Sequence, residues 1–208
     1  MQRLRDQLQA SDLRWLSGYL SIKESHSAAL WWHQDWWCWD HPVSFSRATT
    51  QVAVLCYLTG TSEENGALRV MPKSHHQSMP LHRHLPEPHG DDANRLPPDH
   101  PAMLDCPGQR TVPARAGDAV LLDYRLLHGT HPNNTPYRRD CILLSFIPNW
   151  SRLSADLQAH CMMHPALPCE EEAPSLLASG YSDLVPQFAG IPASIAVNRL
   201  APADFFAR

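Results

Sequence analysis

The sequence has no long apolar run, no excess of positive charge and no apolar leader. No stretch reaches the roughly 18 consecutive apolar residues of a transmembrane helix, and residues 1–12 are charged and polar where a secretory signal would be apolar. The formal net charge of −4 does not fit a nucleic-acid-binding surface. These absences predict a cytoplasmic protein with neither a membrane nor a nucleic-acid partner.

The cysteines show no paired C-x-x-C spacing. Two of the six, Cys56 and Cys141, lie inside apolar, strand-like runs, which indicates buried free thiols rather than a disulfide framework. Near the C-terminus, four residues are of the types that bind zinc, namely His160, Cys161, His164 and Cys169. Because their spacing fits no established zinc motif, we interpret them as surface residues.

Proline and histidine are abundant, with 19 and 13 residues in a chain of 208. Many prolines and few long periodic stretches favour strands and irregular loops over a helical bundle. The length and the 43% content of hydrophobic residues fit one domain over residues 1–208.

Hydrophobic patterning predicts a mainly β domain. Apolar residues at 4, 8, 13 and 16 predict a short amphipathic helix over residues 1–16. Strand-like runs bounded by turn signals follow at residues 18–23, 51–59, 67–71, 119–124 and 140–148. Together with the aromatic stretch at 28–40 they give at least six strands, which is typical of an antiparallel sandwich or barrel.

Two regions lack a regular pattern. Residues 72–108 are rich in His, Pro, Asp and Gly and predict a long loop insertion. Residues 151–208 predict a C-terminal tail of mixed helix and loop. We expect both regions to contribute to a substrate pocket, because such pockets vary through their loops.

His33 and Asp35 form an H-x-D motif inside the aromatic stretch. In a strand, residues i and i+2 point to the same side, so an imidazole and a carboxylate can meet at one point. Two His and one carboxylate with open positions left over make the facial triad of non-haem iron oxygenases. The third ligand that we expect is His128, which follows a strand and precedes Gly129. His131 is a rival, but it precedes Pro132 in a loop.

Arg139 lies eleven residues after His128, at the start of a strand. Its two-pronged guanidinium can clamp a carboxylate, and Thr130 can add a hydroxyl to the same group. Arg138 is the alternative, and only one of these two neighbours can face the site. In the tryptophan cluster at 31–39, we expect Trp36 or Trp37 near the substrate.

The chain resembles the phytanoyl-CoA dioxygenase family of Fe(II)/2-oxoglutarate oxygenases. The matching segments are WHQD at 32–35, ENGALRVMPKSH at 64–75 and GDAVLLDYRLLHGTHPNNTPYRR at 117–139, and the matching region spans residues 19–150. The resemblance implies a double-stranded β-helix, also called a jelly roll or cupin-like fold, with short flanking helices. Family members usually carry helices ahead of the first strand, whereas here a short helix precedes Tyr19.

The same resemblance implies a set of roles. His33, Asp35 and His128 would bind Fe(II), and Arg139 would pair with 2-oxoglutarate. Further contacts to the cosubstrate fall on Thr130, Tyr19, Gln51 and Leu55. With O2, such a centre would hydroxylate or otherwise oxidise a C–H bond of a small-molecule substrate and release succinate and CO2. Related halogenases lack the carboxylate ligand, so Asp35 disfavours halogenation.

Two other interpretations remain open from the sequence. One is a non-catalytic or degraded jelly-roll protein that binds a ligand and has kept only the fold. The other is a cupin-like metal isomerase or hydrolase, which would need no cosubstrate. The substrate and the oligomeric state are not predicted.

Overall fold

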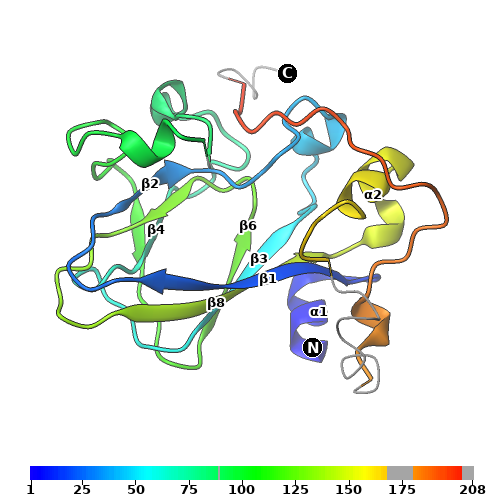
Figure 1. Cartoon of the computed structure of the whole chain (residues 1–208), viewed down its shortest axis with the longest axis horizontal. Helices are drawn as coiled ribbons and strands as arrows, with labels where there is room; N and C mark the ends of the chain where they lie inside the picture. Colours follow the sequence, from blue (N-terminus) through cyan, green and yellow to red (C-terminus); the bar gives the residue numbers. More distant parts are fainter. Residues whose placement is uncertain (89, 168–179, 203–208) are drawn as a thin grey trace.

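The computed structural model describes residues 1–88, 90–167 and 180–202, which leaves Cys169 of the possible zinc ligands outside the described residues. Eight strands in these ranges form two four-stranded antiparallel sheets (Figure 1). The first sheet has the order β1 (Arg14–Lys23), β8 (Arg139–Ile147), β3 (Val52–Tyr57) and β6 (Ala119–Asp123). The second has the order β2 (Leu30–His33), β7 (His128–Thr130), β4 (Leu68–Val70) and β5 (Arg110–Val112). This alternation of strands between two sheets is the jelly roll that the resemblance implies, so the predicted fold class is confirmed.

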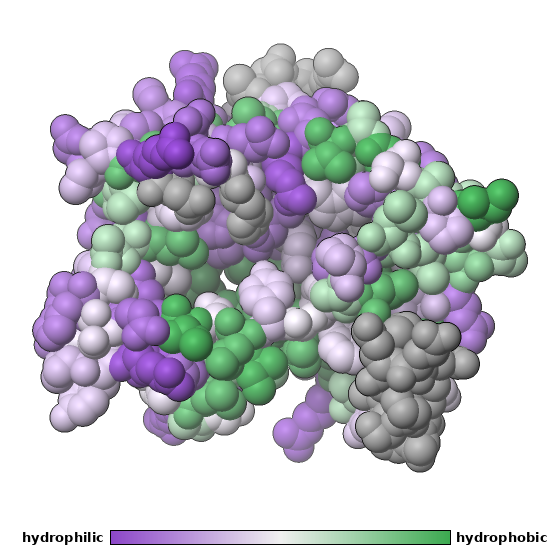
Figure 2. Space-filling view, in the orientation of Figure 1, coloured by the Kyte–Doolittle hydropathy of each residue, from purple (hydrophilic) through white to green (hydrophobic). Residues whose placement is uncertain are grey.

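The core lies between the two sheets, because alternate residues of each strand point inward. Leu55 and Tyr57 of β3 pack there with Leu68 of β4 and Leu122 of β6. On the outer side of the first sheet, Leu20 remains 50% exposed, and Figure 2 shows apolar residues on the part of the face where β1 runs in Figure 1. Within the described ranges, no helix has both the length and the apolarity needed to cross a bilayer.

The predicted helix over residues 1–16 is wrong beyond its first half. The helix α1 covers Gln2–Leu8, and Gln9 ends it in a left-handed conformation with φ 49°. From Arg14 onward the chain is already in β1, where it pairs with β8 over nearly the whole length of that strand. The ladder overrides the helical spacing of Leu13 and Leu16, since pairing and burial together outweigh a weak local propensity.

The insertion and the tail contain short elements of their own. In and before the insertion lie the 3-10 turns η1 (Pro42–Phe45), η2 (Pro80–His84) and η3 (Ala93–Arg95). The tail contains η4 (Trp150–Arg152), α2 (Ala155–Cys161) and η5 (Ser182–Leu184). The strands β2, β5 and β7 are only three or four residues long, which is too short for a clear hydrophobic period.

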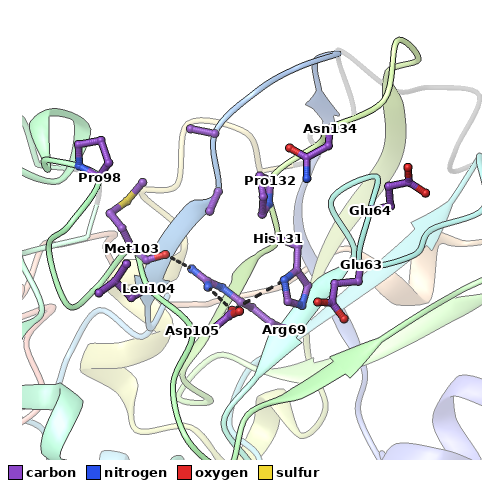
Figure 3. Close-up of a pocket in the computed structure, with 12 residues that line it drawn as sticks. Glu63, Glu64, Arg69, Pro98, Met103, Leu104, Asp105, His131, Pro132 and Asn134 are labelled. Carbon is purple, nitrogen blue, oxygen red and sulfur yellow. Dashed lines mark hydrogen bonds and ion pairs between the residues drawn. The ribbon is translucent and has the colours of Figure 1, made fainter.

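Arg69 holds the end of the insertion on the outer face of the second sheet. Its guanidinium donates to Asp105 and to the backbone oxygen of Met103, and it stacks over the Trp32 ring at 4.6 Å. Figure 3 shows the contacts of Arg69 with Asp105 and Met103 at a surface pocket of about 640 Å³, with His131 beside Asp105. This pocket lies on the opposite side of the sheet from the core.

Arg125 is the main buried polar brace of the fold. Its Nε and one Nη donate to Asp123 at 3.0 and 2.8 Å. The remaining N–H groups donate to the backbone oxygens of Ser44, Ser46 and Ala48. The residue is 1% exposed. Arg125 therefore ties the segment after β2 to the turn that leads into β7.

We predict that Arg125→Met lowers the free energy of unfolding by about 3–5 kcal/mol, because it leaves Asp123 buried without its partner. The matched control is Arg138→Met, which breaks an ion pair to Asp140 whose arginine side chain is 56% exposed. That change should cost less than about 1 kcal/mol. Urea denaturation followed by circular dichroism measures both values, and equal losses in the two variants would contradict the assigned brace.

Candidate metal centre

His33 and His128 face each other across two neighbouring strands. His33 ends β2, His128 begins β7, and the two are direct partners in the antiparallel register. Their ring centroids are 4.2 Å apart, and the residues are 5% and 7% exposed. The register therefore brings two imidazoles from residues 95 positions apart to one buried point.

Asp35 completes the group from the segment that follows β2. Its Oδ1 lies 3.6 Å from Nε2 of His33, and its Oδ2 lies 3.5 Å from Nε2 of His128. The three ligand atoms all lie within 4.8 Å of one another. Among the described ranges, these residues are the only three or more His, Cys, Asp or Glu side chains that come together in this way.

Backbone contacts orient both imidazoles. Nδ1 of His33 lies 2.9 Å from the backbone oxygen of Trp31, and Nδ1 of His128 lies 2.9 Å from that of Leu126. A carbonyl oxygen only accepts, so each Nδ1 carries a proton, and in the neutral ring each Nε2 presents a lone pair. Both lone pairs are on the nitrogens that face Asp35. Two neutral nitrogens and one carboxylate fit a divalent transition metal with positions left open.

Asp35 also lines a cavity of about 540 Å³, within the range of small-molecule sites. Tyr19, Trp37 and Gln51 share this lining. The indole of Trp37 donates to Oε1 of Gln51 at 2.8 Å, and Nε2 of Gln51 donates to Ser145 at 2.8 Å. Gln51 is thus held between the cavity wall and the first sheet.

Two phenols face the same cavity. Tyr19 is 53% exposed, but partial desolvation of its phenol at the cavity wall, reinforced by the charge of Asp35, raises its pKa to about 12. Burial and Asp35 also raise the pKa of Tyr124 well above its ordinary value. Both hydroxyls therefore keep their protons at neutral pH, and that of Tyr124 takes part in the hydrogen-bond network of Ser145 and Gln51.

Arg139 points inward from the start of β8 and is 4% exposed. Its guanidinium lies 5.7 Å from the centre of the Tyr57 ring, and its Nε is buried without a hydrogen-bond partner among the described residues. Arg138 points the other way, toward Asp140. Burial and the charge of Arg139 lower the pKa of Lys23, its register partner, to about 8. Two buried cations, Lys23 and Arg139, therefore lie side by side where β1 ends and β8 begins.

The other expected site residues are Thr130 and Leu55, which point into the space between the sheets, and Trp36, which does not line the cavity. Thr130 is buried two residues after His128, on the same face of β7, where its hydroxyl accepts from the backbone of Leu30 at 3.3 Å. Leu55 lies in the core between the sheets, opposite Leu143. Trp36 does not reach the cavity, because it is 1% exposed and its indole donates to Ser44.

His131, the rival ligand, lies outside the group. Its Nε2 is 2.8 Å from the Thr111 hydroxyl, and it lines the surface pocket with Arg69 (Figure 3). Sequence reasoning missed Tyr124, although it lies at the end of a recognised strand. It also missed Arg199 as a cavity residue, and the irregular tail offers no signal that would have found it.

Comparison with known proteins identifies relatives of this fold. The family model described as phytanoyl-CoA dioxygenase (PhyH) matches residues 1–141. A probable alpha-ketoglutarate-dependent hypophosphite dioxygenase of Stutzerimonas stutzeri is 25% identical over 187 residues, which are 88% of this chain and 59% of that protein. An L-proline trans-4-hydroxylase of Streptomyces griseoviridis is 28% identical over 167 residues, covering 74% of this chain and 60% of that protein.

A solved structure is similar as well. HygX from Streptomyces hygroscopicus, crystallised with nickel and 2-oxoglutarate bound, superimposes with a TM-score of 0.53 at 25% identity. The match covers 70% of this chain and 59% of that chain. The chain thus spans about 60% of the length of these relatives.

We predict that His128→Ala weakens Mn(II) binding by at least about 100-fold, since removing a ligand costs no less than removing a residue that only orients one. His131→Ala is the matched control, because it removes a buried imidazole three residues away that is outside the group. Isothermal titration of the metal-free proteins gives the dissociation constants. Loss of binding in the His131 variant and not in the His128 variant would identify the rival as the ligand.

Proposed function

The chain belongs to the phytanoyl-CoA dioxygenase family, and we propose that it is an Fe(II)/2-oxoglutarate-dependent dioxygenase that oxidises a C–H bond of a small molecule. The observation that carries the proposal is the convergence of His33, Asp35 and His128 on one point at the wall of a cavity. The names of the hypophosphite and proline relatives support a small-molecule substrate. A cytoplasmic location stays a prediction.

The proposed metal ligands are the Nε2 atoms of His33 and His128 and the carboxylate of Asp35. Together they carry one negative charge and would occupy one face of a metal ion, which would leave positions for a bidentate cosubstrate and for O2. When bound, Fe(II), 2-oxoglutarate and O2 together supply oxidation of a C–H bond, with release of succinate and CO2. The residues of the chain hold, orient and enclose these groups.

Arg139 is the proposed partner of the far carboxylate of 2-oxoglutarate. Its buried guanidinium has an Nε without a hydrogen-bond partner in the described ranges, and burying a cation in this state is costly. A carboxylate would satisfy it in a two-pronged contact. Lys23 lies beside it in the register and adds a second positive charge. We place the hydroxyl of Thr130 near this carboxylate and the phenol of Tyr19 near the metal-binding end.

The remaining expected roles belong to the same proposal. Gln51 would orient the cosubstrate through the network with Trp37 and Ser145. Leu55 would form part of the apolar floor. Trp37, which lines the cavity, is the proposed aromatic contact to the substrate. A degraded, non-catalytic jelly roll is not favoured, because the three ligands and the inward-facing arginine are all present.

We expect anaerobic addition of Fe(II) and 2-oxoglutarate to produce the weak visible absorption band of their chelate. Admitting air should then convert 2-oxoglutarate to succinate slowly, even without a substrate. The band and the succinate together support an oxygenase. A band without succinate would favour a binding protein, and a folded protein with neither would contradict the proposed cosubstrate.

Arg139→Gln should weaken 2-oxoglutarate binding to the Mn(II)-loaded protein by roughly 10- to 100-fold, the value of a charge-assisted hydrogen bond of about 1.5–3 kcal/mol. Arg138→Gln, at the neighbouring outward-facing position, should leave the affinity unchanged. The melting temperature of the Arg139 variant should not fall, because the variant loses a buried cation that has no counter-ion in the part of the chain that the structure describes. Calorimetric titration and thermal melts check both expectations.

A further inference from the structure

A second basic region lines the cavity that contains Asp35. Arg199 of the tail and the two histidines His160 and His164, at and after the end of α2, all belong to the lining. Asp35 is the only carboxylate among the described lining residues, and it belongs to the metal group. The guanidinium of Arg199 makes no hydrogen bond or ion pair with any residue in the described ranges. Among the residues that the structure describes, this cavity arginine therefore has no anionic partner.

Specific backbone contacts hold Arg199 at this position. The preceding residue, Asn198, donates its backbone N–H to Trp37 and accepts from the backbone N–H of Trp39, both at 3.0 Å. Its side-chain amide donates to Asp40 at 2.8 Å. The tail therefore pairs with the segment that follows the H-x-D motif, and one of the residues that hold it there, Trp37, also lines the cavity.

Both histidines are fixed as hydrogen-bond donors. Nδ1 of His160 accepts from the backbone N–H of Ile195 at 3.2 Å, and Nδ1 of His164 accepts from that of Ala166 at 3.1 Å. A nitrogen that accepts carries no proton, so in the neutral ring Nε2 carries it. Burial lowers the pKa of both rings, and the charge of Arg199 contributes for His160. At neutral pH each ring therefore presents an N–H donor.

An apolar wall adjoins these donors. The His160 ring stacks on Trp37 with centroids 4.5 Å apart and an interplanar angle of 22°. Leu16, Met163 and Val197 belong to the same lining. A ligand that fits must therefore combine an apolar body with a group that accepts several hydrogen bonds and carries negative charge.

We propose that Arg199, with His160 and His164, binds an oxyanion of the primary substrate, which is a small organic acid with a carboxylate or phosphonate on an apolar body. The inference rests on the proposed function, because it assigns the substrate of that site. The apolar body lies against Trp37, in the cavity that Asp35 lines. Arg199 sets specificity by holding the acid group, and it is distinct from Arg139, which holds the cosubstrate.

The probes are 3-phenylpropionate and benzylphosphonate, with 3-phenylpropanamide as their neutral counterpart. Each is titrated calorimetrically into the full chain, once without additions and once with saturating Mn(II) and 2-oxoglutarate. We expect at least one acid to bind in both conditions, and the amide to bind at least about tenfold more weakly. Binding of only one acid identifies which oxyanion the site accepts.

Arg199→Gln should lower the affinity for the acid by at least about tenfold, which is the contribution of a charge-assisted hydrogen bond. Arg199→Lys should bind the acid more tightly than Arg199→Gln but less tightly than the wild type, since lysine keeps the positive charge but lacks the paired N–H donors of the guanidinium. Arg152→Gln removes an exposed cation outside the cavity and should change nothing. Circular dichroism confirms that the variants are folded.

Three results would overturn the proposal: no binding of either acid to the wild-type chain, equal binding of acid and amide, or full affinity in Arg199→Gln. The affinity for 2-oxoglutarate is measured in the same samples. If 2-oxoglutarate fails to bind while an acid binds through Arg199, the dioxygenase proposal fails and the oxyanion site stands. If 2-oxoglutarate binds but no acid binds through Arg199, only the substrate assignment fails and the dioxygenase proposal stands.

Discussion

The close approach of β7 to β2 at Gly129 is the constraint on which the candidate centre depends. A Cβ at this position would lie 2.7 Å from the backbone oxygen of Leu30 and 2.9 Å from that of Trp31, so a side chain would force the strands apart. With glycine there, the strands come close enough for His33 and His128 to meet as a register pair. The backbone oxygen of Trp31 also accepts from Nδ1 of His33. Strand spacing and imidazole tautomer are thus set by the same peptide group.

The centre is connected to the rest of the fold through the segments on either side of it. Arg125 joins the segment after Asp35 to the turn before His128, and Gln34 donates to the backbone oxygen of Arg125 from the middle of the H-x-D motif. Trp36 closes the core behind this motif through its bond to Ser44. Misplacing any of these parts would move the ligands, because packed interiors transmit displacements rather than absorb them.

Local features could be predicted from the sequence, and long-range ones only in part. The H-x-D motif predicts that His33 and Asp35 meet, although Asp35 lies in the segment after β2 and not in the strand itself, and the jelly roll follows from the family resemblance. The prediction of a helix over residues 1–16 is wrong in its second half because the residues from Arg14 onward pair with β8. The choice between Trp36 and Trp37 required the structure, since neighbouring residues face opposite sides. The position of Arg199 in the cavity could not be predicted from the sequence, because it depends on a long-range β-bridge between Cys38 and Asn198.

Charge balance connects the two proposals, the cosubstrate contact of Arg139 and the substrate contact of Arg199. A metal dication and a dianionic cosubstrate would cancel each other formally. What remains on the described chain is one carboxylate, Asp35, against the guanidinium groups of Arg139 and Arg199, with Lys23 adding further positive charge. Like charges enclosed in a medium of low dielectric destabilise one another unless an anion joins them. A site filled as proposed would be short of negative charge, and a substrate that brings an oxyanion to Arg199 would supply it where an uncharged substrate of the same shape would not.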